Sequence, residues 1–217
     1  MQQDYTHVGV VLDASFSMKH IVDKVRQALL NFVATQEQAM ESGEKVSVDA
    51  YKFGTDVERI CHDARLRDLR TIADRYDADM GGTALYDAVC RGIDELGQFF
   101  ASLPEHKRPE DVIFVIATDG AENSSKKFLI EDVQSRIREQ TDKYSWKFIF
   151  LASGIDAKAT AVDLGFDQSA PDFDRYVCQS PSHAEFSDNL MRVMDICMKD
   201  VRADRFERRK RPDENNK

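Results

Sequence analysis

Apolar runs alternate with amphipathic segments along most of this chain. Consecutive or alternating apolar residues indicate strands, and apolar residues that recur every three or four positions indicate helices. The expected strands are 8–12, 46–53, 57–61, 112–117, 147–152 and 175–178. The expected helices are 21–33, 85–103, 128–139, 156–164 and one that begins near Ser182, while 68–76 is a short polar helix or a loop.

This order of elements predicts an α/β fold, with a doubly wound, mostly parallel and Rossmann-like central sheet and helices on both faces. Gly54-Thr55-Asp56 lies between two expected strands as a hairpin turn, so we also expect one antiparallel edge strand. Residues 1–201 are expected to form a single domain, because 42% hydrophobic residues in a chain of 217 suffice for one sizeable core. The basic segment 202–217 is expected to be a flexible tail.

Charge and cysteine spacing exclude several classes of protein. A formal net charge of −9 argues against general affinity for nucleic acid, for which the basic segment is the only candidate. The four cysteines include no C-x-x-C pair, which argues against a zinc ribbon and a dense disulfide framework. The sequence shows no signal-peptide pattern and no apolar stretch of membrane-spanning length, so we expect a cytoplasmic protein without membrane contact.

Oxygen-bearing side chains follow two of the expected strands. Asp13, Ser15 and Ser17 come directly after the first strand, and Asp119 follows the apolar run 112–117. The carboxyl ends of parallel strands meet at one edge of a sheet, so we expect Asp13 and Asp119 to lie close together. Carboxylate and hydroxyl oxygens are hard donors of the kind that Mg²⁺ prefers, and together they predict a cation site at that edge.

With Gly81-Gly82-Thr83 and Thr118-Asp119-Gly120, the motif Asp13-Ala14-Ser15-Phe16-Ser17 resembles the metal-ion-dependent adhesion site (MIDAS) of the von Willebrand factor A (vWA) family. Residues 146–166 are similar to stand-alone vWA proteins of bacteria and their phages. The resemblance implies Mg²⁺, with Mn²⁺ or Ca²⁺ as alternatives. It implies direct ligation by Ser15 and Ser17, state-dependent ligation by Thr83, and Asp13 and Asp119 acting directly or through water.

The resemblance also implies a metal-dependent protein-interaction module. One metal position would take an Asp or Glu carboxylate from a protein partner, and intracellular members of the family often act with AAA+ ATPases. Two alternatives stay open: a metal-dependent hydrolase that uses the same Asp and Ser residues, and a structural subunit of a phage or cellular assembly. We expect no enzyme, because a serine nucleophile needs a base and the nearest one, His20, has no evident orienting acid.

Three further residues near these motifs bear on the site. Phe16 stands where the common form of the motif has glycine, although the integrin β-subunit form carries an aromatic residue there, and we expect it to pack beneath the loop. Glu122 and Asn123 follow Asp119 closely, and either could support the ligands or belong to a solvated loop.

Overall fold

The computed structural model describes residues 1–40 and 43–210. Six strands form one sheet in the order β3-β2-β1-β4-β5-β6. Strands β2 and β3 are antiparallel, and the other neighbouring pairs are parallel. The predicted α/β sheet with an antiparallel edge strand is therefore confirmed. The strands are β1 Gln2–Asp13, β2 Lys45–Phe53, β3 Val57–Arg65, β4 Pro109–Thr118, β5 Lys147–Ser153 and β6 Val177–Ser180.

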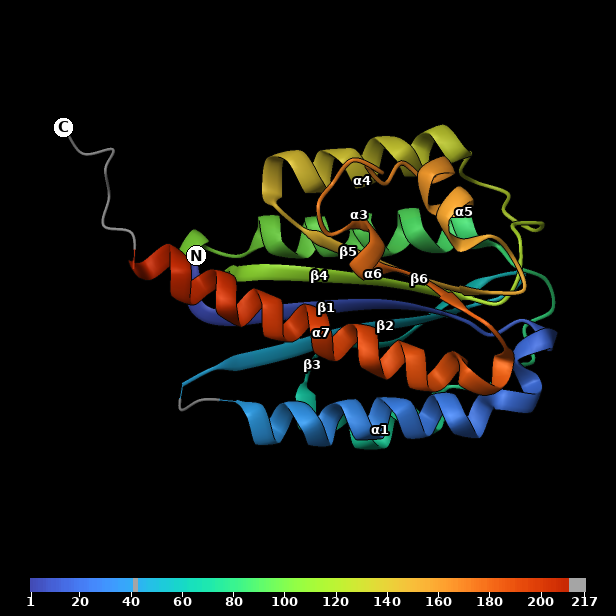
Figure 1. Cartoon of the computed structure of the whole chain (residues 1–217), viewed down its shortest axis with the longest axis horizontal. Coiled ribbons are helices and arrows are strands. Elements are labelled where there is room, and N and C mark those ends of the chain that lie inside the picture. Colours follow the sequence, from blue (N-terminus) through green and yellow to red (C-terminus); the bar gives the residue numbers. More distant parts are fainter. Residues whose placement is uncertain (41–42, 211–217) are drawn as a thin grey trace.

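Helices cover both faces of the sheet, as predicted (Figure 1). One face carries α1 Val22–Ala39, the short α2 Leu69–Ile72 and the long α7 His183–Lys210. The other face carries α3 Leu85–Ser102, α4 Ile130–Tyr144 and α5 Ala157–Asp163. The single turn α6, Phe173–Tyr176, leads into β6. In the part of the chain that the structure describes, no helix has both the length and the apolar character needed to cross a membrane.

Two apolar cores separate the sheet from its helices. Alternate residues of β1 pack into opposite cores, because successive side chains of a strand point to opposite faces of the sheet. Val8 and Val10 pack into the core beneath α1 and α7, whereas Val11 packs into the core beneath α3 and α4. Both faces of the parallel strands are thus buried, which explains their nearly continuous apolar sequence.

Several elements are longer than their apolar patterns indicate. Strand β1 begins at Gln2 rather than Val8, because its polar residues Thr6 and His7 are buried with hydrogen-bonding partners instead of lying in a loop. Helix α4 begins at Ile130 and ends at Tyr144. The expected start of the last helix is confirmed, with α7 beginning at His183.

The last helix continues through the basic cluster. Because α7 runs to Lys210, the prediction of a flexible tail from residue 202 is wrong for residues 202–210, and residues 211–217 lie outside the described part of the chain. The arginines of this segment pair with acidic residues of the same chain. Arg202, Arg205, Arg208 and Arg209 form ion pairs with acidic residues at the amino-terminal ends of β1, β2 and β4, namely Asp4, Glu44, Glu110 and Asp111.

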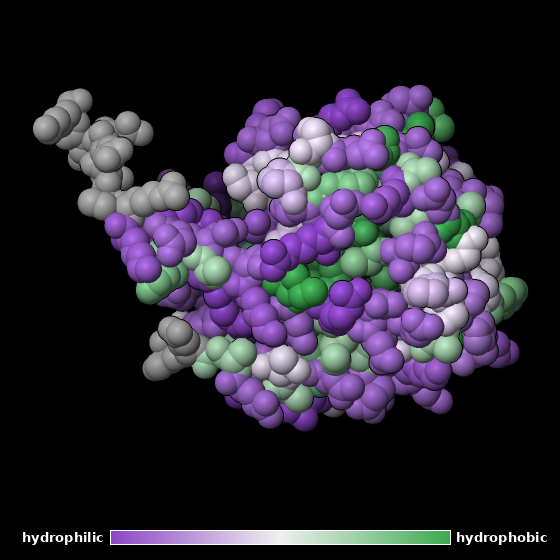
Figure 2. Space-filling model, in the orientation of Figure 1, coloured by the Kyte–Doolittle hydropathy of each residue, from purple (hydrophilic) through white to green (hydrophobic). Residues whose placement is uncertain are grey.

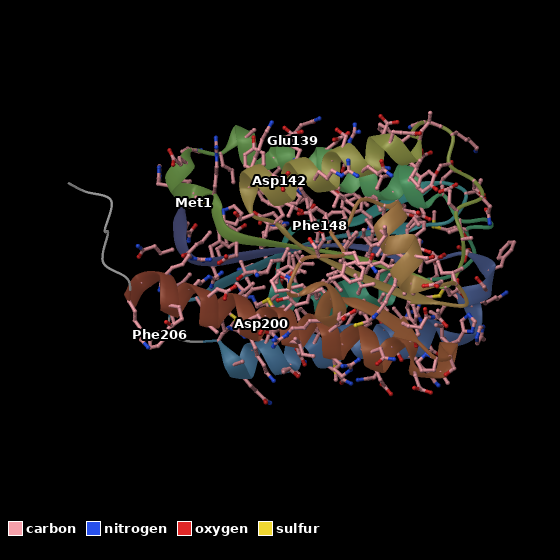
Figure 3. The ribbon with its side chains drawn as sticks, turned by 45° about the horizontal axis from the view of Figure 1, so that its top comes forward. Met1, Glu139, Asp142, Phe148, Asp200 and Phe206 are labelled. Carbon is pink, nitrogen blue, oxygen red and sulfur yellow. The ribbon has the colours of Figure 1, made fainter. Side chains whose placement is uncertain are left out.

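Arg205 is the central residue of this ion-pair cluster. Its side chain is 3% exposed, and it donates hydrogen bonds to Asp111 and to the Thr6 hydroxyl. Its neighbour Phe206 lies at the outer end of α7 and points away from the sheet (Figure 3). The end of the last helix is therefore fixed by a buried cation that the amphipathic pattern does not identify.

A second buried polar network joins β1, β2 and β3. His7 and Asp49 have fully buried side chains, with His7 Nε2 3.1 Å from Asp49 Oδ2. His62 Nδ1 lies 2.8 Å from Asp49 Oδ1, and the Asp63 N–H donates to Asp49 Oδ2 at 2.9 Å. Burial by itself favours the neutral carboxyl, but His7 and the donors from Asp63 and His62 outweigh it and lower the pKa of Asp49.

The network predicts acid-dependent stability. A depressed folded-state pKa means that ionised Asp49 stabilises the fold above the unfolded-state value of about 3.9, and that this stabilisation is lost as the pH falls through the folded-state pKa. Asp49→Asn is expected to lower the free energy of unfolding at pH 7 by about 1–3 kcal/mol. Denaturant titrations should show this difference shrinking as the pH falls below about 5 and through the lowered folded-state pKa. A difference independent of pH would contradict the assigned ionisation.

An apolar hollow is visible on the face shown in Figure 2, where green side chains gather near its centre. Its lining includes Ile137 of α4, Trp146 just before β5, Phe148 of β5 and Phe166 after α5. Phe148 is labelled in Figure 3, between α4 and α7. Strand β5 pairs with β6 only from Phe150 onward, so this hollow lies beside the less covered beginning of β5. It is separate from the loops at the carboxyl ends of the strands.

Candidate metal site

The sequence-predicted ligands lie on three loops at the carboxyl-terminal edge of the sheet. Strand order reverses between the neighbouring strands β1 and β4, and such a reversal is where open α/β sheets form their binding sites. The register pairs Leu12 with Ala117, which places Asp13 beside Thr118 and one residue from Asp119. Figure 1 shows these loops at the right-hand end of the sheet, together with the start of α7.

Backbone hydrogen bonds connect the loops to one another. The Ala14 N–H donates to the Phe53 carbonyl at 2.6 Å, and the Met80 N–H donates to the Ala14 carbonyl at 3.0 Å. The Phe16 N–H donates to the carbonyl of Gly81 at 3.2 Å, and Gly81 has a φ of +84°, which glycine adopts without strain. These main-chain contacts hold the loops in place independently of any ion.

Three of the expected ligands form one hydroxyl–carboxylate cluster. The Ser17 hydroxyl donates to Asp119 Oδ1 at 2.7 Å, and the Ser15 hydroxyl lies 3.5 Å from the same oxygen. The two serine Oγ atoms are 2.9 Å apart. Ser15 and Asp119 are buried, whereas Ser17 is exposed, so the cluster opens toward solvent on one side.

Asp13 lies beneath this cluster and is fully buried. Its Oδ1 accepts the Ser15 N–H at 2.8 Å, and its Oδ2 accepts the Thr118 hydroxyl at 2.5 Å. Burial raises the pKa of Asp13, hydrogen bonds from Thr118 and Ser15 oppose that change, and the nearby Asp119 charge adds to it. The net pKa of Asp13 is raised, because burial, the largest effect, disfavours the charged carboxylate more than the hydrogen bonds favour it.

Thr83 is brought to the same loops but does not join the cluster directly. Its N–H donates to Asn123 Oδ1 at 2.9 Å, and its carbonyl accepts the Asn123 N–H at 3.0 Å. A Cβ atom built on Gly120 would lie 3.3 Å from Thr83 Oγ1, so the hydroxyl faces the Asp119-Gly120 turn. Asn123 therefore positions Thr83, while Glu122 accepts the Tyr86 N–H at the start of α3.

Sequence reasoning missed His183. Its Nε2 lies 2.9 Å from Asp119 Oδ2, and its ring packs edge-to-face against His20 with centroids 5.0 Å apart. The two contacting residues, His183 and Asp119, are 64 positions apart, so their contact depends on how α7 packs against the sheet. The sequence offers only one weak signal, the position of His183 beside Ser182 at the expected helix start.

The side chain of Phe16 does not lie where we expected it. We expected its side chain to pack beneath the loop, but it is 65% exposed, so that prediction is wrong. The hydroxyls of Ser15 and Ser17 both turn inward to Asp119, and this leaves the intervening side chain facing outward. The site consequently carries an apolar side chain on its solvent rim.

The donor atoms have the spacing that a divalent ion needs. Ligands about 2.1 Å from an octahedral ion lie about 3.0 Å from one another. The separations of 2.7–3.5 Å among the oxygen atoms of Ser15, Ser17 and Asp119 are close to that value.

Among the described residues, no group of three His, Cys, Asp or Glu side chains could hold a metal. Hydroxyl groups and water would therefore complete the coordination shell of an ion at this site.

No family model matches the sequence, and no curated protein matches it. The comparison with solved structures, in contrast, agrees with the fold described above. Among solved structures, proximal thread matrix protein 1 from the mussel byssus is similar, with a TM-score of 0.61 and 15% identity over 88% of this chain and 46% of that chain. The chain has a vWA-type fold.

A second structure of the mussel protein is described as having a zinc-occupied MIDAS motif. It matches with a TM-score of 0.61 and 15% identity over 89% of this chain and 46% of that chain. This chain thus spans about half the length of the mussel protein. At 15% identity the likeness shows the vWA-type fold of this chain and nothing of its ligand.

Proposed function

We propose that this protein is a metal-dependent interaction module of vWA type, which binds an acidic side chain of a protein partner through a Mg²⁺-type ion. The observation that carries the proposal is the convergence of Ser15, Ser17 and Asp119 on one solvent-facing point at the strand reversal. Two carboxylates and a few neutral hydroxyls leave a six-coordinate dication short of ligands. A partner carboxylate would supply the missing charge and oxygen.

Each residue of the site has a distinct part in this proposal. Ser15, Ser17 and Asp119 would hold the ion, with Mn²⁺ or Ca²⁺ as alternatives to Mg²⁺, and Asp13 would position the Ser15 loop from below. Thr83, held by Asn123 beside the cluster, would engage when the partner binds. The exposed Phe16 would contact an apolar surface next to the partner's carboxylate. A bacterial or phage protein that acts with an AAA+ ATPase is the setting that the sequence resemblance suggests.

Binding is favoured over hydrolysis by the surroundings of the serines. Both hydroxyls are directed toward Asp119, and His183 contacts that carboxylate rather than either hydroxyl. Serine nucleophiles are most often activated by a histidine that hydrogen-bonds the hydroxyl itself, and His183 makes no such bond in the described structure. Assays of phosphatase and esterase activity with Mg²⁺ or Mn²⁺ should accordingly give no turnover above a Ser15→Ala control.

A displayed random-peptide library tests the binding proposal. Peptides selected in Mg²⁺ should contain Asp or Glu, and should lose binding in EDTA or when that residue becomes Asn or Gln. Thr83→Ala should weaken their binding by about ten- to hundredfold, equivalent to about 1–3 kcal/mol, because one contact made on engagement is lost. The Mg²⁺ affinity of that variant should stay within about threefold, since no hydrogen bond joins the Thr83 hydroxyl to the cluster in the described chain.

The matched control is Thr71→Ala, which removes an exposed threonine hydroxyl that bonds only within the α2 region. It should bind both the ion and the peptides as the unmodified protein does. Peptides that bind equally well in EDTA, or equally well to Thr83→Ala, would place the interface elsewhere on the vWA-type fold.

A further inference from the structure

We infer that His183 supplies a nitrogen ligand to this site and makes it prefer Zn²⁺-class ions over Mg²⁺, an inference that rests on the proposed metal site. The residues that define the sequence motif offer oxygen donors alone. The start of α7 adds an imidazole whose Nε2 lies 2.9 Å from Asp119 Oδ2. The donor set around Asp119 is therefore mixed.

The geometry places His183 and Ser17 at opposite oxygens of one carboxylate. Ser17 Oγ lies 2.7 Å from Asp119 Oδ1, and His183 Nε2 lies 2.9 Å from Asp119 Oδ2. Both separations match the distance of about 3.0 Å between neighbouring ligands of one ion. The Asp119 carboxylate therefore has a hydroxyl at one oxygen and an imidazole at the other, and these two groups would hold an ion together with it.

Two further features favour ligation by His183. Its side chain is 36% exposed, so the ring can turn from the carboxylate toward an arriving ion without leaving a buried cavity. His20 packs edge-to-face against the same ring, at an interplanar angle of 63°, and comes from the 3-10 helix Phe16–Ile21, which contains Ser17 and directly follows Ser15. The ring is thus held near the site by the segment that carries the serine ligands.

The chemical consequence is selectivity. Imidazole nitrogen suits Zn²⁺, Co²⁺ and Ni²⁺, whereas Mg²⁺ takes oxygen ligands and retains water. Zinc binds most mixed sites more tightly than magnesium, so a zinc preference in the unmodified protein would not be diagnostic by itself. The diagnostic quantity is the change in the ratio of zinc to magnesium affinity when His183 is replaced.

The experiment is calorimetric titration of the metal-free full chain with MgCl₂ and with ZnCl₂. His183→Gln keeps an N–H that can donate to Asp119 but offers a poor zinc ligand, and His183→Ala removes both functions. Zinc affinity should fall at least about tenfold in both variants, and magnesium affinity should change less than about threefold. His106→Ala, which removes an exposed histidine of the turn Glu105–Lys107, should change neither affinity.

Absorption spectra with Co²⁺ give an independent readout, because replacing a nitrogen ligand by water shifts the visible bands of the ion. The spectrum should change in His183→Gln and stay unchanged in His106→Ala. Zinc affinity retained in His183→Gln, or equal losses of zinc and magnesium affinity, would overturn ligation by His183 and leave it a hydrogen-bond donor to Asp119. Absence of both Mg²⁺ and Zn²⁺ binding by the unmodified protein would instead refute the proposed function.

Discussion

Arg205→Ala is expected to lower the free energy of unfolding by about 3–5 kcal/mol. This is the largest loss that we expect from any residue of the basic segment 202–210, which the sequence alone suggests is solvated. The side chain is buried against Asp111 and Thr6, with Glu44 and Glu110 also within ion-pair distance. Its removal leaves carboxylates with reduced access to water and without their main cation. Urea titration followed by circular dichroism would measure the loss.

Arg208→Ala is the matched control for this prediction. Arg208 lies one helical turn further along α7 and pairs with Glu110 and Asp111, but its side chain is 51% exposed. Solvent screening limits such a pair to less than about 1 kcal/mol. Losses below about 1 kcal/mol in both variants would show that the ion pairs of α7 contribute little to stability.

Asp119→Asn is expected to reduce Mg²⁺ affinity by more than about 100-fold, because changes that merely reorient a metal ligand already cost ten- to hundredfold. Asparagine keeps the size of the side chain and can still accept the Ser17 hydroxyl, so the apo fold should be retained. At 100 times its Kd, Mg²⁺ should stabilise the unmodified protein by about 2.7 kcal/mol, and this stabilisation should vanish in the variant. Thermal melts with and without Mg²⁺ provide the measurement.

Asp79→Asn controls for the change of charge. Asp79 is exposed beside the loop that carries Thr83, and it makes no hydrogen bond to the cluster in the described structure. Its substitution should leave the Mg²⁺-dependent rise in melting temperature intact. The same rise in Asp119→Asn as in the unmodified protein would show that the ion binds away from the proposed site.

The parts of the site that could be predicted follow from local rules. Asp13, Ser15 and Ser17 directly follow one buried parallel strand and Asp119 follows another, and the carboxyl ends of such strands always share an edge. Their convergence therefore required no knowledge of side-chain packing. The buried state of Asp13 and its bond to Thr118 were not evident, because they depend on the one-residue register between β1 and β4.

The parts that could not be predicted involve α7. Whether His183 reaches Asp119, and whether Arg205 reaches Thr6 and Asp111, depends on the direction in which the last helix crosses the first strand. A basic, weakly amphipathic ending is typical of solvated tails, and the sequence pattern alone favours that interpretation. Burial of Arg205 instead compensates acidic residues at the beginnings of two strands, Glu44 before β2 and Glu110 and Asp111 in β4.

The ion pair between Arg209 and Asp4, with an N–O separation of 2.9 Å, brings the two ends of the described chain together at the edge opposite the loops that carry Ser15, Thr83 and Asp119 (Figure 1). Joining the ends by a short linker and opening the chain at an exposed turn should therefore give a circular permutant with the same loops. Fusion partners attached at either end would likewise extend away from the proposed metal site. In the proposed function, the polarity of the sheet would thus separate attachment at one edge from recognition at the other.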